Sequence, residues 1–449
     1  MRTMRLNSAN ANRHTPWAGS ANIEDGVTID TQGLNGITLS PDKKSVSIGP
    51  GNKWGEVYKE LDEYGLMTSG GRVASVGVGG LILGGGISFY SPRFGLVCDN
   101  VINYEMVMAD GVISNVNATS NPQLFKALKG GSNNLGVITR FDLKVFEGGN
   151  LWGGFLVNPI TEQENIFNLF EKFAKSDGYD PYAAMILSVA YTPSRGGWSI
   201  ASNMEYTKPT PNPPVFQPFT ALPQLLSTMR ITNMTALSTE LDASSPPGGR
   251  DLFATATFKN SAKMMNTIVD LANRTVQNFA TAQGLVFSLS FQPLPQAVTS
   301  PGFATTAGLG NSLGLSIDDG DLVNVLLTVQ WRDPANDAVI DSSVKSLFAD
   351  IEKASRAAAT YHPYLYLNYA APWQKPIDGY GAESVKFLST VAGKVDPDGV
   401  FQKLVTGGFK LGATASTEPD GQILASPLPN VNAASVQPAS AQADPRPGR

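Results

Sequence analysis

Glycine and small apolar residues are interleaved over Val73–Gly86, where six of the fourteen residues are glycine. Glycines this dense let a backbone adopt positive φ angles and bring its N–H groups against a flat or anionic ligand. The Val, Ile and Leu residues between them are too apolar for a flexible linker, so we expect a buried loop that binds a ligand closely. A Walker loop would need a Lys after its last glycine, and none follows. The dinucleotide fingerprint Gly-x-Gly-x-x-Gly fails as well, because Ile82 is its sixth residue counted from Gly77. We call Val73–Gly86 the cradle.

Two further motifs follow the cradle residues Ser75–Gly86 in a fixed order, at Gly95–Asn100 and Gly130–Thr139. Together the three resemble the berberine bridge enzyme-like FAD-linked oxidoreductases, and the fungal secondary-metabolism branch is the most similar. The resemblance runs from about His14 to about Leu411. It implies FAD as the cofactor and an α+β, two-domain fold of the PCMH type, with a substrate domain built on an antiparallel sheet.

The resemblance implies that His14 is bonded covalently to the flavin. In the family a histidine followed by a polar residue makes this bond, and the block His-Thr-Pro-Trp-Ala-Gly-Ser matches from His14 onward. Imidazole suits the task because its pKa lies near neutrality. The alternative is an ordinary loop histidine near the surface. Some members add a second bond from a cysteine, but Val73 stands at that position, so the link is not bicovalent. The single cysteine, Cys98, has apolar neighbours that favour a buried structural thiol.

The remaining cofactor contacts implied by the resemblance come from the cradle and from the two later motifs. Glycines of the cradle would present N–H groups to the diphosphate or the ring, and the later motifs would cap the pocket or close over the cofactor. These residues are Ser75, Val76, Gly77, Gly79, Gly80, Gly84, Gly85, Asp99, Asn100, Gly136, Val137 and Thr139. Val76 matches the position that gates oxygen above the flavin, although strand packing explains it equally well. A turn role is an equal alternative for Asp99 and Asn100.

The run Tyr366-Leu-Asn-Tyr369 matches a Tyr-x-Asn-Tyr motif at the active-site end of the family's substrate sheet. The resemblance implies that Tyr369 is the catalytic base and that Asn368 and Tyr366 line the flavin or the substrate. A phenol, with a pKa of about 10, acts as a base at neutral pH only where its surroundings favour the ionised form. Strand alternation would put Asn368 and Tyr369 on opposite faces, so both roles together imply a bulge. Simple packing of aromatic residues on a sheet is the alternative.

Upstream of His14 the sequence departs from the family. Asn10-Ala-Asn-Arg13 stands where the glycines of the diphosphate loop belong, and the strands and helix before that loop have no counterpart. We therefore expect an N-terminally truncated FAD-binding domain with a weakened hold on the diphosphate.

The composition of the chain limits the classes of partner that it can bind. The 449 residues carry a net charge of −5 and are 42% hydrophobic, which fits a soluble globular protein. A sequence pI of about 5.3 argues against nucleic-acid binding. One cysteine excludes an internal disulfide framework, and two histidines argue against a structural zinc site. No apolar run reaches the roughly 20 residues of a membrane-spanning helix, so no membrane partner is expected. The N-terminus lacks the apolar core of a signal peptide, although related proteins are often secretory.

The elements that must position these residues form two groups. Up to about residue 150 we expect strands at 27–30, 44–48, 101–109 and 137–145, with helices over 53–64 and after Asn121. Beyond it, helices alternate with strands at 154–158, 184–191, 198–206, 252–259, 285–292, 322–332 and 364–370, which favours one antiparallel sheet backed by helices. We expect an FAD-binding domain over 1–150, a substrate domain over 151–370, a return to the FAD domain over 371–411 and a disordered tail over 412–449.

The resemblance implies an FAD-dependent oxidoreductase of secondary metabolism that oxidises a small organic metabolite, such as a polyketide or alkaloid alcohol. Tyr369 would remove a proton as the flavin accepts a hydride, and molecular oxygen would then reoxidise the flavin. Two alternatives stay open. One is a redox-silent or incomplete relative that binds FAD poorly or not at all; the other is a carbohydrate oxidase, which usually needs the double tether that Val73 forbids.

Overall fold

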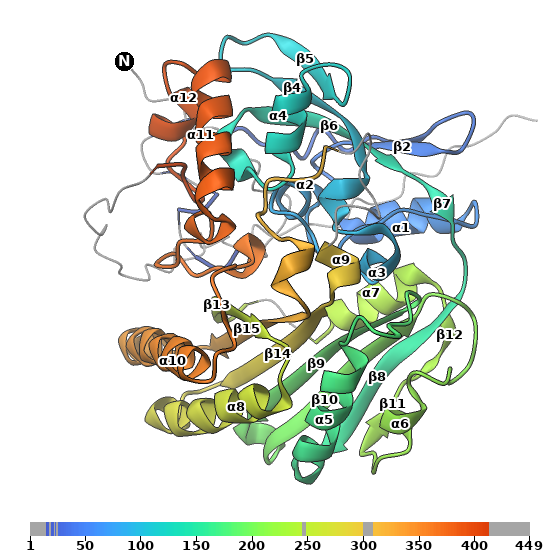
Figure 1. Ribbon diagram of the computed structural model, residues 1–449, viewed down its shortest axis with the longest axis vertical. Coiled ribbons are helices and arrows are strands. Elements are labelled where there is room, and N and C mark those ends of the chain that lie inside the picture. The colour runs from blue at the N-terminus through green and yellow to red at the C-terminus, as the bar shows by residue number, and fades with distance from the viewer. Residues whose placement is uncertain are drawn as a thin grey trace, which may run out of the picture.

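The computed structural model describes residues 15–17, 19–21, 23, 26–244, 248–299 and 309–412. His14 and the expected tail beyond Gly412 lie outside these ranges. Two hydrophobic cores, each built around its own sheet, form the described part of the chain (Figure 1). We call them the first lobe and the second lobe. No helix within the described ranges is long and apolar enough to cross a membrane.

The first lobe is organised by a five-stranded antiparallel sheet with the order β1-β2-β6-β4-β5. Its strands are β1 (Ile37–Leu39), β2 (Ser45–Ile48), β4 (Val101–Val107), β5 (Ile113–Asn117) and β6 (Val137–Lys144). The short strands β3 (Leu66–Met67) and β7 (Phe146–Glu147) pair separately. The strand expected at 27–30 is wrong: Val27 makes a single bridge and stays 44% exposed, so its apolar side chain finds no core to stabilise a strand.

Helices pack around this sheet where the apolar spacing is helical. These are α1 (Trp54–Asp62), α2 (Val78–Leu83), α3 (Ser91–Phe94), η1 (Val97–Asn100), α4 (Pro122–Leu128) and η2 (Ser132–Asn134). In α1, Trp54, Val57, Tyr58 and Leu61 are buried on one face, as the spacing predicts.

The cradle, expected as a loop, contains the helix α2 at its centre. Gly77 takes the extended N-cap conformation, and Val78 and Ile82, four residues apart, are buried on one side of the helix. Gly85 and Gly86 follow with φ angles of +103° and +82°. Residues with side chains rarely adopt such angles, so this pair turns the chain away after the helix.

The second lobe contains a nine-stranded antiparallel sheet with the order β11-β8-β10-β9-β14-β15-β13-β16, and β12 also pairs with β8. Its strands are β8 (Leu151–Pro159), β9 (Ala183–Thr192), β10 (Gly197–Tyr206), β11 (Leu226–Ser227), β12 (Arg230–Thr232), β13 (Arg250–Lys259), β14 (Val286–Leu294), β15 (Leu322–Trp331) and β16 (Tyr361–His362). The expected antiparallel sheet backed by helices, and with it the α+β fold class, is confirmed.

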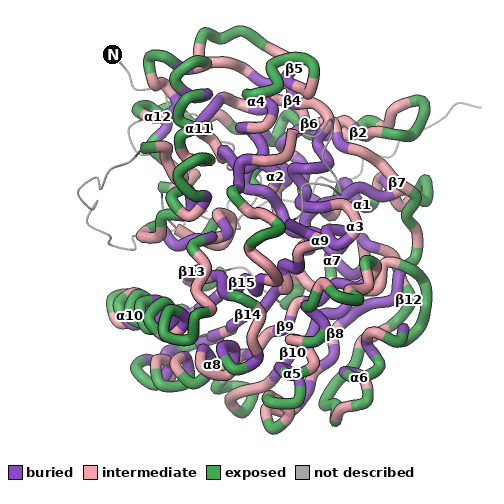
Figure 2. Tube along the Cα trace, viewed as in Figure 1, coloured by how far each residue is buried: buried purple, intermediate pink, exposed green. Residues whose placement is uncertain are grey.

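The two faces of this sheet differ in chemistry. The helices α5 (Gln163–Phe173), α8 (Ala262–Val276) and α10 (Asp337–Ala357) bury one face in the second core, and only their outer surfaces are exposed (Figure 2). On β10, Ile200 and Met204 belong to that core, so Asn203 and Glu205 point to the opposite face. By the same alternation Gln292 of β14 lies on that opposite face, beside Asn324 of β15. This buried polar face looks toward the first lobe.

Beyond the sheet the chain returns to the first lobe. The turn η9 (Leu367–Tyr369) precedes α11 (Ala382–Val395) and α12 (Val400–Lys403), and α11 packs against α4 (Figure 1). The strand expected at 364–370 is therefore wrong. Pro363 has no N–H for a sheet ladder, and β16 ends immediately before it at His362.

Candidate active site

The Tyr-x-Asn-Tyr motif lies on the turn η9 and its N-cap and rests against the cradle. Asn368 Nδ2 donates to the Leu81 carbonyl oxygen at 3.1 Å and to Tyr366 Oη at 3.0 Å. The same Tyr366 oxygen accepts from the Ile87 N–H at 3.1 Å. The rings of Tyr366 and Tyr369 meet edge to face, with centroids 4.6 Å apart. A 3₁₀ turn therefore gathers all three side chains, and the bulge expected from strand alternation is not needed.

Two cradle glycines have opposite surroundings. A Cβ atom on Gly84 would lie 2.1 Å from Asn368 Oδ1, so only glycine lets the motif approach this closely. A Cβ atom on Gly80 would have no atom within 4 Å, and Gly80 is exposed. Protein contacts thus explain the first glycine but not the second. Gly80 leaves backbone accessible to a ligand, which fits the cofactor role expected of the cradle.

Arg72, immediately before the cradle, joins the motif to the second lobe. Its Nη2 donates to Tyr369 Oη at 2.6 Å and to Gln292 Oε1 at 2.5 Å. Tyr369 Oη also lies 3.2 Å from Gln292 Oε1, so the three groups form a closed triangle. The Arg72 side chain is almost fully buried and lies over the ring of Phe89, 5.9 Å from its centroid.

A carboxyl group is buried near this triangle without a hydrogen-bond partner. Glu205 is fully buried, and neither of its oxygens accepts a hydrogen bond of ordinary geometry from a described residue, although the Asn203 side chain interacts with the carboxyl group. Burial raises the pKa of Glu205 well above its usual range, while the positive charge of Arg72 opposes that rise. Asn203, two residues earlier on β10, leaves its Oδ1 without a partner as well. Buried polar atoms are rarely left unpaired, so this end of the sheet has capacity to bind a polar ligand.

Other expected cofactor residues have partners within the protein. The Ser75 hydroxyl donates to Asp242, the last residue of α7 (Met234–Asp242), and Val76 packs against the first core. Asp99 accepts from the Leu96 N–H and from Asn311 Nδ2, and burial raises its pKa. Asn100 donates to the carbonyl oxygens of Phe94 and Leu96. The contacts of Asp99 and Asn100 are those of the turn-capping alternative.

The third motif is divided between the sheet and the cradle. A Cβ atom on Gly136 would lie 2.1 Å from Met106 Cε, and the Thr139 hydroxyl donates to Glu105 on the neighbouring strand. Val137 begins β6 and is half-buried. The turn η2 just before them touches α2, so the third motif reaches the cradle there. Gly77 pairs in a bridge with Lys53, and a Cβ atom on Gly79 would lie 3.5 Å from the side chain of Pro50.

Lys410 reaches the same loop from the far end of the chain. Its Nζ donates to Asn133 Oδ1 at 3.1 Å, and Asn133 Nδ2 donates to the Gly407 carbonyl oxygen. Burial lowers the pKa of Lys410 to about 7, because no carboxylate of a described residue forms an ion pair with the amine. An anionic group bound beside this loop would supply the missing charge.

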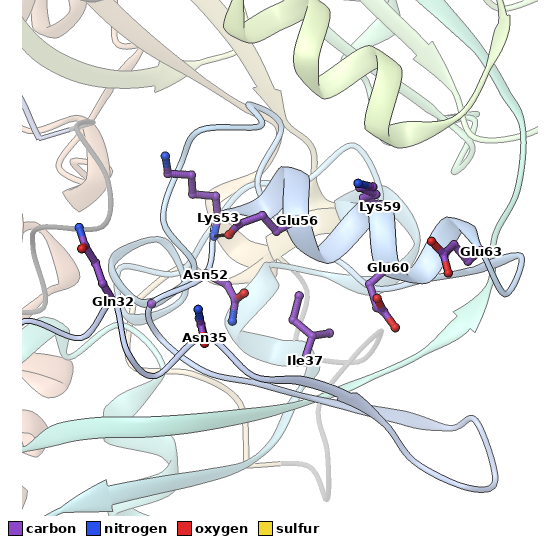
Figure 3. Close-up of a pocket in the computed structure, with 10 residues that line it drawn as sticks. Gln32, Asn35, Ile37, Asn52, Lys53, Glu56, Lys59, Glu60 and Glu63 are labelled. Atoms are coloured by element: carbon purple, nitrogen blue, oxygen red, sulfur yellow. Dashed lines mark hydrogen bonds between the residues drawn. The ribbon is translucent and has the colours of Figure 1, made fainter. Parts of the chain in front are cut away.

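An open groove lies elsewhere on the described part of the chain. It has a volume of about 600 Å³ and runs between α1 and the segment 32–37 (Figure 3). Glu56, Glu60 and Glu63 line it together with two lysines, and Glu56 accepts from the Lys53 N–H. It is open, and three carboxylates disfavour an anionic cofactor. The Arg72 triangle is the stronger candidate site because hydrogen-bonding groups from three distant segments converge there.

Sequence reasoning missed Arg72, Gln292, Glu205 and Lys410. Two of them still left a signal: Arg72 is a lone cation between Gly71 and an apolar run, and Glu205 is a carboxylate within an otherwise uncharged strand. Which lobe these side chains face depends on strand pairing, which the sequence pattern alone does not give.

The chain is similar in sequence to known flavoproteins. Residues 9–117 match a family model described as an FAD binding domain. The FAD-dependent monooxygenase sdcF of Emericella nidulans is 36% identical over 401 residues, spanning 89% of this chain and 83% of its own length.

Two solved structures share the fold. The 6-hydroxy-D-nicotine oxidase of Arthrobacter nicotinovorans superposes with a TM-score of 0.72 at 18% identity, covering 89% of this chain and 85% of the other. The berberine bridge enzyme of Eschscholzia californica superposes with a TM-score of 0.69 at 15% identity, and the match covers 93% of this chain and 86% of the other.

Substitutions at the two contrasting glycines test the cradle. We expect Gly84→Ala to lower the melting temperature of the flavin-free protein, because the new Cβ must displace Asn368. Gly80→Ala should leave that temperature unchanged or slightly raised, since alanine favours a helix by roughly 0.5–1 kcal/mol over glycine, yet it should reduce flavin content. Equal flavin content in Gly80→Ala and the wild type would show that the cofactor does not approach Gly80.

Proposed function

The chain belongs to the berberine bridge enzyme-like family of FAD-linked oxidoreductases, and from that premise we propose that it oxidises a small organic metabolite where the two lobes meet. The triangle of Arg72, Gln292 and Tyr369 carries this proposal. In this triangle the Tyr369 phenol lies beside a buried cation and next to the glycines expected to hold the cofactor, which supports a role for the phenol as proton acceptor. The enzyme's place would be in secondary-metabolite biosynthesis, as the resemblance to the fungal branch implies.

The residues present fit FAD. We propose that the cradle at Gly80 would hold the cofactor and that Asn133 would bind its diphosphate together with Lys410, whose partly buried amine lacks a described carboxylate partner. His14 would attach the flavin covalently. Val73 stands where some members of the family have a cysteine, so a second bond, through a cysteine sulfur, is ruled out. When bound, FAD supplies the two-electron acceptor.

The side chains of this chain would supply orientation and proton transfer. The guanidinium of Arg72 donates a hydrogen bond to Tyr369 Oη and so fixes the position of that oxygen beside the cradle. Tyr369 would then take a proton from the substrate as a hydride leaves the neighbouring carbon. Asn368 and the Tyr366 ring hold Tyr369 in place against the cradle. Molecular oxygen would accept the two electrons and leave as hydrogen peroxide.

Monooxygenation is a second candidate, because sdcF and other relatives are named FAD-dependent monooxygenases. The two outcomes differ in the fate of the oxygen atoms. An oxidase releases both as peroxide, whereas a monooxygenase transfers one to its product. Turnover under isotopically labelled oxygen gas, with peroxide quantified, separates them.

Tyr369→Phe tests the assigned base. The substitution keeps the ring against Tyr366 but removes the oxygen, so we expect anaerobic flavin reduction by small phenols or alcohols to slow by about 10²-fold or more. Flavin content should not change. Tyr64→Phe, at an exposed tyrosine, is the matched control. A Tyr369→Phe enzyme that is reduced at the wild-type rate would remove Tyr369 from the chemistry.

The covalent link is tested by acid precipitation. Wild-type protein should retain its yellow colour in the pellet, whereas His14→Ala should release all of its flavin to the supernatant. Flavin that stays with the acid-precipitated variant would identify a different anchor.

Lys410 gives a pH dependence for flavin binding, measured in the His14→Ala variant so that binding is reversible. The pKa of about 7 means that the amine is charged below neutrality and neutral above it, and a diphosphate favours the charged form. FAD should therefore bind more weakly as pH rises from 7 to about 9. Introducing Lys410→Met into the His14→Ala variant should weaken FAD binding and flatten its pH profile. Lys394→Met, at an exposed lysine, should do neither. An unchanged profile in Lys410→Met would place the diphosphate elsewhere.

A further inference from the structure

Arg72 is a buried cation whose hydrogen bonds to described residues all go to uncharged groups. Its Nη2 donates to an amide oxygen and to a phenolic oxygen, on Gln292 and Tyr369. No carboxylate of a described residue lies within ion-pair distance of it. Burying a charge without a counter-charge costs free energy, and such charges are often found at binding or catalytic sites.

The nearest candidate for a counter-charge does not supply it. Glu205 is close enough for Arg72 to affect its ionisation, but burial raises the pKa of this carboxyl well above its usual range. Burial thus favours the neutral form of Glu205, and neither of its oxygens lies within ion-pair distance of Arg72. The other titratable groups around Arg72 are the phenols of Tyr58, Tyr366 and Tyr369, and burial raises the pKa of the first two.

The guanidinium also has donors to spare. Arginine carries five N–H groups in a planar fork, and Nη2 accounts for two of them. Neither Nη1 nor Nε makes a hydrogen bond to a described residue. Three donors thus remain for a ligand, on a group whose planar geometry matches an oxyanion on a flat skeleton.

The surroundings favour a flat ligand. The rings of Phe89 and Tyr366 near the guanidinium are buried, and the half-buried ring of Tyr369 meets that of Tyr366 edge to face. The exposed part of the Tyr369 ring offers a surface on which an aromatic or conjugated ligand can stack. Cation and rings together suit an aromatic or enolic oxyanion better than an aliphatic alcohol.

From this convergence we infer that Arg72 binds the substrate through an ionised hydroxyl, so that the substrate is a phenol or a stable enol bound as its anion. The inference rests on the proposed function and names its substrate class. On binding, the hydroxyl proton goes to solvent and the oxyanion accepts hydrogen bonds from Nη1 and Nε of Arg72. An electron-rich phenolate or enolate is also a better donor of electrons than its neutral form.

Binding of para-nitrophenol to the flavin-loaded protein tests this directly, because the visible spectrum of this probe reports whether it is ionised. We expect it to bind as the phenolate, even somewhat below the pH at which the free probe ionises. Arg72→Met should weaken binding by about 10- to 100-fold, the effect typical of losing hydrogen bonds to a charged group. Arg72→Lys should restore part of the affinity. The methyl ether para-nitroanisole, which cannot ionise, should bind weakly and equally to wild type and Arg72→Met.

Arg93→Met is the matched control. This half-buried arginine also stacks on aromatic rings, those of Phe94 and Tyr182 among them, but it makes no contact with the triangle. It should leave binding of the probe unchanged. Melting temperature and flavin content establish that each variant is folded.

Two results would overturn the inference: equal affinity for para-nitrophenol in folded wild type and Arg72→Met, or a bound spectrum of the neutral phenol. Failure of the proposed function has a different signature. In that case the probe would still bind through Arg72 as an anion, but no phenol or alcohol would reduce the flavin.

Discussion

The hydrogen bonds of the Arg72 guanidinium hold together the place where the two lobes meet. One nitrogen donates to Gln292 on the sheet of the second lobe and to Tyr369 on the chain returning to the first. Hydrogen bonds from a charged donor are about twice as strong as neutral ones, which offsets part of the cost of burying the cation. This contact fixes where the cradle lies relative to the polar face of the sheet. Asn368 adds the second constraint, because it fits against Gly84 only in the absence of a side chain there.

Much of the fold could be predicted from the sequence because its determinants are local. Alternating apolar residues in β9, β10 and β15 predict strands, and the apolar spacing over 53–64 predicts α1. Prediction failed where distant contacts decide the structure. The sequence of segment 364–370 predicts a strand. Pro363 nevertheless interrupts the ladder of sheet hydrogen bonds, and the contacts of Asn368 with the cradle favour a turn. The many glycines of the cradle predict a loop, so the helical spacing of Val78 and Ile82 was not recognised.

The candidate site could be predicted only where a motif marks it. The resemblance identified Tyr366, Asn368 and Tyr369, and the structure brings them together beside the cradle. Arg72 belongs to none of the family motifs, and Glu205 faces the first lobe only because of the register of β10. A strand shifted by one residue would turn that carboxyl toward the helices, so periodicity alone could not identify it. His14 stays a prediction, since it lies outside the described residues.

A double-mutant cycle between Arg72 and Tyr369 tests the central claim, that these two residues act as one unit at the junction of the lobes. The rate of anaerobic flavin reduction by one small phenol is measured for the wild type, Arg72→Met, Tyr369→Phe and the double variant. Residues that share a hydrogen bond have coupled effects, so the loss caused by Tyr369→Phe should be at least about tenfold smaller once Arg72 is gone. If instead the two losses multiply, Arg72 and Tyr369 act independently, and the claim that the guanidinium prepares the phenol for proton transfer is wrong.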